Sequence, residues 1–227
     1  MGTEAEQTSP ERSLIWRWLR FLAGMSLIAL GVALSIRAGL GATPISTIPT
    51  VLAEVTPVTV GTYLMALNVF FVVLQILLLR RRFPPFQLVQ LPLAILFGLL
   101  CDAALWATRW INPGHYAEQV LWTVLSILVL ALGVYIEVVA RVAYLPGDGI
   151  VFTLHQLIRM RFGTVKQLFD WTLVLLAIAL SLILLGELFG AREGTALSAI
   201  GVGAVVKVIE RLHSRWLLRR RQAPGRA

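Results

Sequence analysis

The segment ALGV at residues 29–32 occurs again at residues 131–134, which is 102 positions later. The same spacing aligns Pro44 with Pro146, and a Gly-Thr pair also recurs. Apolar matches alone carry little weight, because membrane helices share leucine and isoleucine. Matches of proline and glycine between the apolar runs are more specific. The sequence therefore predicts two copies of one structural unit.

The composition places these units in a membrane. Hydrophobic residues make up 58% of the chain and charged residues 14%, whereas soluble domains carry roughly 25% charged residues. The mean hydropathy is +0.80. Several apolar runs approach the ~20 residues that a spanning helix needs. We therefore predict six spans, of which the last is the weakest because Lys207 and Glu210 crowd its end. The predicted spans are residues 16–36, 62–79, 88–107, 120–139, 168–185 and 195–209.

The lysines and arginines predict the orientation of the spans. If the N-terminus lies inside, 17 of the 20 basic residues lie on the inner side, and only Arg37, Arg109 and Arg192 lie outside. This asymmetry follows the positive-inside rule and predicts that both termini are cytoplasmic. The net charge of +8 is then explained by contact with lipid headgroups rather than with nucleic acid.

Each unit contains three spans, so the second unit must enter the membrane from the opposite side. The predicted fold class is an all-α polytopic membrane protein with six transmembrane helices in two inverted-topology three-helix repeats. We expect an N-terminal tail at residues 1–14, the first repeat at 15–110 and an outer loop at 111–118. The second repeat follows at 119–212, and a basic tail at 213–227. Inverted repeats are typical of secondary transporters.

A proline-led connection follows the first span of each unit. Ser46 and Asp148 are predicted N-caps of short helices at residues 47–55 and 149–160, because their side chains can accept hydrogen bonds from free backbone N–H groups. The two helices either dip into the membrane, with their N-termini facing a shared cavity, or lie flat at its two surfaces. The sequence leaves both alternatives open. The candidate substrate- or ion-binding residues are Pro44, Ser46, Thr47, Asn68, Pro146, Gly147, Asp148, Gly149 and Asp170.

Charged residues within the apolar runs predict structural or gating ion pairs. Glu137 and Arg141 are four residues apart, so they would share one helix face and neutralise each other. Lys166 has the same spacing from Asp170. Asp102 has no local partner, and Arg37 is near the same predicted surface. The candidate ion-pair residues are Arg37, Asp102, Glu137, Arg141 and Lys166.

No catalytic or metal-binding motif is present in the sequence. His115, His155 and His213 are scattered over the predicted loops and the C-terminal tail, and Cys101 is the single cysteine. We find no zinc-protease, nucleophile-elbow or phosphate-loop pattern. The sequence therefore predicts neither an enzyme, nor a metal site, nor a cofactor.

Several segments resemble the YczE/YitT-type bacterial integral membrane proteins. The resemblance is carried by GLGATPISTIP, FQLVQLPLAILFGLLCD, LPGDGI, FGTVKQLFDWTLVLLAIALSL and GAREGTALSAIGVG, which are spread over most of the predicted membrane region. It implies a multi-pass protein of the bacterial cytoplasmic membrane. It implies no substrate and no catalytic role.

The expected function is secondary transport of a small polar or anionic solute by alternating access of the two repeats. The expected partners are the lipid bilayer and the solute, and a proton or cation that couples to transport is compatible with this function. A homo-oligomer is compatible with it as well. The alternative is a non-transporting membrane partner or regulatory scaffold of an enzyme or complex. A transporter needs polar groups facing a cavity, whereas a scaffold needs none.

Overall fold

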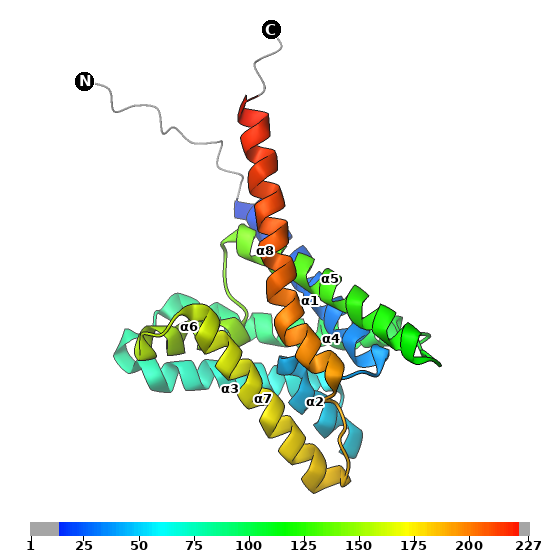
Figure 1. Cartoon of the computed structure of the whole chain (residues 1–227). Coiled ribbons are helices and arrows are strands. Elements are labelled where there is room, and N and C mark those ends of the chain that lie inside the picture. Colours follow the sequence, from blue (N-terminus) through cyan, green and yellow to red (C-terminus); the bar gives the residue numbers. More distant parts are fainter. Residues whose placement is uncertain (1–13, 223–227) are drawn as a thin grey trace, which may run out of the picture.

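The computed structural model describes the backbone of residues 14–222 and the side chains of residues 14–213. The regular elements within this range are all helices (Figure 1). The predicted tails at 1–14 and 213–227 fall largely outside the described side chains. The α-helices are α1 (Leu14–Ala38), α2 (Pro44–Val55), α3 (Val60–Leu79), α4 (Gln90–Ala107), α5 (Tyr116–Ala140), α6 (Pro146–Ile158), α7 (Phe162–Leu185) and α8 (Glu193–Gln222). Two short 3₁₀ turns, η1 (Arg80–Arg82) and η2 (Pro85–Val89), connect α3 to α4.

The helix bounds and the helix contacts both recur along the chain. Helix α5 begins and ends 102 residues after α1, and α6 and α7 begin 102 residues after α2 and α3. Helix α1 packs against α4 as α5 packs against α8, and α2 packs against α7 as α3 packs against α6. Each half of the described chain therefore has the same order of elements: one long helix, one short helix and two long helices.

Helices α1 and α5 form the central pair and run antiparallel. The guanidinium of Arg17 donates to the carbonyl of Ala140 at one end, and Gly24 lies against Gly133 further along. A Cβ atom at Gly24 would lie 2.8 Å from the Gly133 carbonyl oxygen. Small residues at this crossing let the two backbones approach closely, as they do in membrane helix pairs.

Five of the described helices are long and apolar enough to cross a membrane: α1, α3 with η1, η2 with α4, α5 and α7. More than half of the best apolar stretch of α1 is buried inside the protein (56%), whereas the corresponding stretches of α3 and α7 are only 28% buried. The outward sides of these helices carry exposed apolar residues such as Phe70, Leu77 and Ile183. These helices indicate a multi-pass membrane protein.

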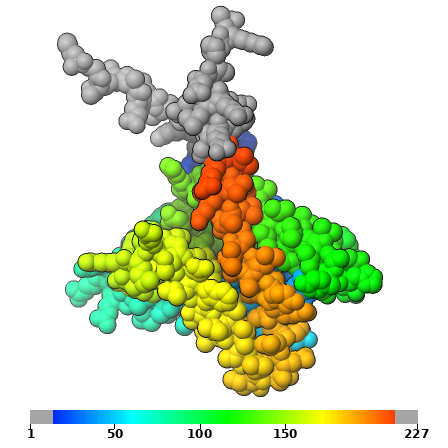
Figure 2. Space-filling model, in the orientation of Figure 1, coloured from blue at the N-terminus to red at the C-terminus, as the bar shows by residue number. Residues whose placement is uncertain are grey.

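Helix α8 is not among these five helices, so the described residues do not bear out the predicted sixth span. Its N-terminal part is apolar, but Lys207, Glu210 and Arg211 follow before a full hydrophobic stretch is complete. Figure 2 shows α8 lying on the surface, between the yellow α7 and the green α5.

The two halves differ in how their last two helices pack. Helices α3 and α4 cross at Gly61 and Gly98, where a Cβ atom on Gly61 would lie 2.2 Å from the Gly98 carbonyl oxygen. The corresponding glycines of the second half, Gly163 on α7 and Gly203 on α8, have open space where a Cβ atom would be. Helices α7 and α8 are therefore splayed apart, whereas α3 and α4 are in close contact.

Three helices end at an arginine with a positive φ angle: α3 at Arg80 (φ 48°), α5 at Arg141 (φ 50°) and α6 at Arg159 (φ 58°). Glycine is the usual residue in this backbone region, because a side chain is strained there. The free carbonyl of Arg141 accepts a hydrogen bond from the guanidinium of Arg17.

Candidate functional site

The two short helices meet at their N-termini in the interior. Helix α2 begins directly at Pro44 and α6 directly at Pro146. Proline suits the first helical position because its missing N–H group would have no partner there. A Cβ atom on Gly147 would lie 2.4 Å from Cδ1 of Ile45, so the first turns of the two helices are in contact.

These helix starts correct the predicted caps. The N-cap residues are Thr43 and Leu145, not Ser46 and Asp148, and neither makes a side-chain capping bond. The helices begin earlier than predicted because the prolines themselves occupy the first turn. The N-terminal halves of both helices are buried inside the bundle, whereas Glu54 of α2 is exposed. Both short helices are therefore packed into the bundle at their N-terminal ends.

The hydroxyl groups of the first turn of α2 are buried and satisfied locally. The Ser46 hydroxyl lies 2.6 Å from the Thr43 hydroxyl, and the Thr47 hydroxyl donates to the Pro44 carbonyl at 2.7 Å. The buried Asn68 on α3 donates from its amide to the Leu64 carbonyl at 2.9 Å. These side chains stabilise helix ends and backbone, and none of them lines a described cavity.

A buried glutamine pair lies against the start of α6, and the sequence analysis did not single it out. Gln75 of α3 and Gln90 of α4 face each other, with Nε2 of Gln75 3.1 Å from Oε1 of Gln90. Gln75 also donates to the Pro146 carbonyl at 3.3 Å. A Cβ atom on Gly149 would meet both amides at about 2.9 Å, so a larger residue there would displace the glutamine pair. Two glutamines separated by a short basic loop were the available sequence signal.

Lys166 on α7 bridges two carboxylates. Its Nζ atom lies 3.0 Å from Oδ1 of Asp170, as the spacing of four residues predicts, and 3.5 Å from Oδ1 of Asp148 on α6. The second contact joins residues that the sequence spacing does not relate. The Asp170 side chain is 12% exposed, whereas those of Lys166 and Asp148 are 35% and 40% exposed.

The predicted ion pair between Glu137 and Arg141 does not form. Helix α5 ends at Ala140, so Arg141 leaves the helix and no longer lies one turn above Glu137. Oε1 of Glu137 instead accepts a hydrogen bond from the Leu145 backbone N–H at 3.2 Å. Glu137 is 5% exposed, whereas Arg141 is exposed.

Arg37 and Asp102 do not pair with each other either. The Arg37 guanidinium donates to the Leu105 carbonyl near the end of α4 at 2.9 Å. The Asp102 carboxylate accepts from the Thr59 hydroxyl at 2.6 Å and from the Gly61 backbone N–H at 2.8 Å. Asp102 therefore binds the N-terminus of α3, where a negative charge is favourable.

Removing this carboxylate should destabilise α3. In Asp102→Ala, the Thr59 hydroxyl and the Gly61 N–H group lose their acceptor, and we expect a loss of about 1–2 kcal/mol. Thermal unfolding in detergent, followed by tryptophan fluorescence, measures the change. Glu54→Ala is the matched control, because Glu54 is exposed on α2. Equal unfolding temperatures for the two variants would contradict the role given to Asp102.

The larger cavity has a volume of about 450 Å³. We call it the first cavity. Its walls are the end of α5, the linker to α6 and the segment around η2. Glu137, Arg141 and Asp148 line it, together with Gln87, whose buried Oε1 atom has no hydrogen-bond partner. Neither of the two cavities described here is lined by the first turns of both short helices, which pack against each other. Of the two short helices, only α6 contributes to the wall of the first cavity.

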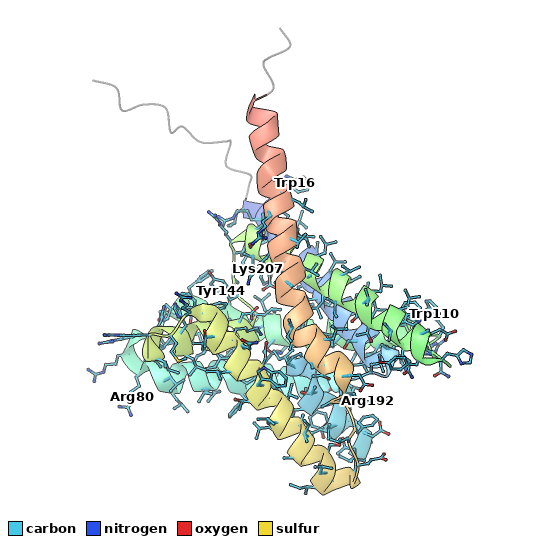
Figure 3. All side chains as sticks on the ribbon, in the orientation of Figure 1. Trp16, Arg80, Trp110, Tyr144, Arg192 and Lys207 are labelled. Atoms are coloured by element: carbon cyan, nitrogen blue, oxygen red, sulfur yellow. The ribbon has the colours of Figure 1, made fainter. Side chains whose placement is uncertain are left out.

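The second cavity, of about 210 Å³, occupies the corresponding place in the other half. Its walls are the end of α1, the linker to α2 and the turn before α8. Ile36 and Ala42 line it, 102 positions before Val138 and Tyr144 of the first cavity. In Figure 3, Tyr144 and Arg80 lie on the left of the bundle, whereas Arg192 of the second cavity and Trp110 lie on the right.

Backbone hydrogen bonds close the segments around the second cavity. Ala42 N–H donates to the Gly190 carbonyl, and Gly194 N–H donates to the Leu40 carbonyl, both at 2.8 Å. We call these two bonds the latch. Among the described residues, the corresponding segments around the first cavity, 142–145 and 85–91, have no such backbone bonds between them. The larger cavity is therefore the one without a latch.

The chain was compared with curated proteins, with solved structures and with protein families. No curated protein and no solved structure matches it. The resemblance to YczE/YitT-type proteins stays a prediction. A family described as a family of unknown function, DUF6198, matches residues 15–211. Because this match covers most of the chain, the protein belongs to the DUF6198 family.

Proposed function

We propose that this protein is a secondary transporter of a small polar solute, which works by alternating access of two inverted three-helix units. The observation that carries the proposal is the pair of corresponding cavities, one latched and small, the other unlatched and large. In transporters of this design, the repeats take up unlike conformations, and exchanging them moves the opening from one side to the other.

The inverted topology is supported by the antiparallel run of α1 and α5 and by the helix starts that recur after 102 residues. Six crossings require α8 to span the membrane together with the five apolar helices. Its packing against α5 matches that of α4 against α1. The distribution of the basic residues supports a topology with both termini on the cytoplasmic side of a bacterial inner membrane. In that orientation the first cavity opens inward.

The class of solute follows from what lines the cavities. A small polar or anionic solute was expected. The anionic class depended on two helix N-termini that face one cavity, and that argument loses its support when the termini pack together. The first cavity is lined instead by the carboxylates of Glu137 and Asp148, the amides of Gln87 and Gln90, and the guanidinium of Arg141. Proteoliposomes screened with labelled metabolites would identify the solute.

Alternating access can be tested without knowing the solute. Ala42 is 1% exposed beside the latch, whereas its counterpart Tyr144 is 53% exposed. In a Cys101→Ala background, Tyr144→Cys should react with a membrane-impermeant maleimide from the inner side. Ala42→Cys should react from the outer side, more slowly, as the latch opens in a minor state.

A disulfide at the latch provides the lock. A Cβ atom on Gly190 would lie 3.8 Å from Cβ of Thr50, which is a suitable separation for a disulfide. The φ angle of +75° at Gly190 strains an introduced cysteine, so the reduced double variant is the reference for the oxidised one. With Thr50→Cys and Gly190→Cys oxidised, we expect labelling at position 42 to fall at least about tenfold, in line with a population shift. Labelling at position 144 should persist, and a reductant should restore position 42. Labelling of both positions from one side only, or no effect of the lock, would refute the proposal.

The alternative is a non-transporting membrane partner of another protein. The open space at Gly163 and Gly203 favours it, because a second helix, from a partner or from a second copy, could pack there as α4 packs on α3. Purification in mild detergent with a stoichiometric partner, together with an inert latch in the labelling experiment, would support this function over transport.

A further inference from the structure

The first cavity contains a buried carboxylate without a cationic partner. Glu137 is 5% exposed and lines the cavity wall. The ion pairs among the described side chains are Lys166 with two aspartates and Arg192 with its neighbour, and Glu137 is in neither group. One carboxylate oxygen accepts the Leu145 N–H bond, and no hydrogen bond from the described residues is made to the other.

A carboxylate in such a place either takes up a proton or pairs with a positive or hydrogen-donating group. Charges buried in a membrane protein are costly, and they pair with one another or mark a path for a solute or ion. Arg141 lines the same cavity, but it is exposed at the end of α5 and forms no ion pair with Glu137. Glu137 therefore has no cationic partner among the described residues.

Besides the Arg141 guanidinium and the Tyr144 hydroxyl, which can donate, this cavity is lined by further acceptors. The buried Oε1 of Gln87 has no donor. The Asp148 carboxylate shares a single lysine with Asp170. The amide of Gln90 is already engaged with Gln75. A ligand that satisfies these acceptors brings hydrogen-bond donors, and a positive charge on it complements the Glu137 carboxylate.

The remaining walls are apolar and aromatic. Phe86, Val134, Val138 and Tyr144 contribute to them, and the volume of about 450 Å³ admits a small organic molecule. An inorganic ion would leave this apolar surface uncovered. A ligand with a hydrocarbon body and an ammonium group matches both parts of the cavity.

The geometry points to a binding site for a small organic cation in the first cavity, with the ammonium group against the Glu137 carboxylate and the hydrocarbon body against Phe86 and Val134. This inference deepens the proposed function, on which it rests, because the bound cation would be the transported solute. An anion held at Arg141 is the opposite possibility, and the experiment separates the two.

Thermal unfolding of the purified full chain tests the site. The probes are n-alkylammonium chlorides of two to six carbons, with the alcohols and sodium carboxylates of equal chain length, all at constant ionic strength set with KCl. We expect at least one ammonium probe to raise the unfolding temperature by about 3–5 °C at ten times its dissociation constant. The matching alcohol and carboxylate should leave it unchanged.

Two variants assign the effect to this cavity. Glu137→Gln keeps an acceptor for Leu145 and removes the charge, so the ammonium shift should disappear. Glu187→Gln is the matched control, because Glu187 is exposed beyond the end of α7, and it should keep the full shift. If Glu137→Gln does not fold, Val134→Phe fills the cavity and should also abolish the shift.

Three outcomes would overturn the inference: no ammonium probe raises the unfolding temperature, the carboxylates or KCl alone raise it as much, or Val134→Phe and Glu137→Gln both retain the shift. Uptake of the positive probe into proteoliposomes then tests the transporter separately. Binding without uptake would refute transport and leave the cation site standing. Uptake that Glu137→Gln does not reduce would support transport and refute the cation site at Glu137.

Discussion

Lys166→Met is expected to lower the unfolding temperature by roughly 5–10 °C, which corresponds to about 2–3 kcal/mol for a chain of this size. The substitution keeps most of the side-chain volume and removes the cation between Asp148 and Asp170. Asp170, which is 12% exposed, would then be a buried charge without a partner. Breaking a fully buried pair in this way costs ~3–5 kcal/mol, and Lys166 is partly exposed, so the expected loss is smaller.

Removing the carboxylate together with the lysine should restore stability. In Lys166→Met with Asp170→Asn, no buried charge is left unpaired, and we expect most of the lost unfolding temperature to return. Lys207→Met is the control, because Lys207 is exposed on α8. If the double variant is no more stable than the single one, the ion pair is not the source of the effect.

The second large effect is expected at the crossing of α3 and α4. Gly61→Ala would place a Cβ atom 2.2 Å from the Gly98 carbonyl oxygen and 2.4 Å from Cγ of Asp102. Backbone atoms cannot yield as a flexible side chain can, so the two helices must separate. Overpacking of this kind costs typically ~1–3 kcal/mol, and the displaced Asp102 bonds add to it. We expect the unfolding temperature to fall by roughly 5–10 °C.

The second half of the chain supplies the matched control. Gly163 is the counterpart of Gly61, 102 residues later, and has open space around its Cβ position. Gly163→Ala should leave the unfolding temperature unchanged or raise it slightly, because alanine favours a helix by ~1 kcal/mol over glycine. Equal losses for both variants would contradict the difference in packing between the two halves.

The order of the helices could be predicted from the sequence because it depends on local patterns. Apolar runs bounded by charge located the five apolar helices, and the spacing of 102 residues anticipated the recurrence of their bounds. The short helices were placed too late, since Ser46 and Asp148 were taken for caps when Pro44 and Pro146 already start the helices. Proline at the first helical position was the overlooked signal.

The site depends on contacts between distant segments, so less of it could be predicted. Spacing along one helix correctly related Lys166 to Asp170, because both remain helical. It failed for Glu137 and Arg141, since the helix ends between them. The Asp102 contact with α3 links residues 41 positions apart in sequence, and only the fold brings them together. The walls of the first cavity come from three such segments.

The arginines at the ends of α3, α5 and α6 have a consequence for biogenesis. Glycine would be less strained at Arg80, Arg141 and Arg159, so the arginines at these positions carry a cost in backbone conformational energy. In the proposed topology all three face the cytoplasm, where positive charge resists translocation. The residues that end these helices would thus also determine the orientation in which the nascent polypeptide inserts into the membrane.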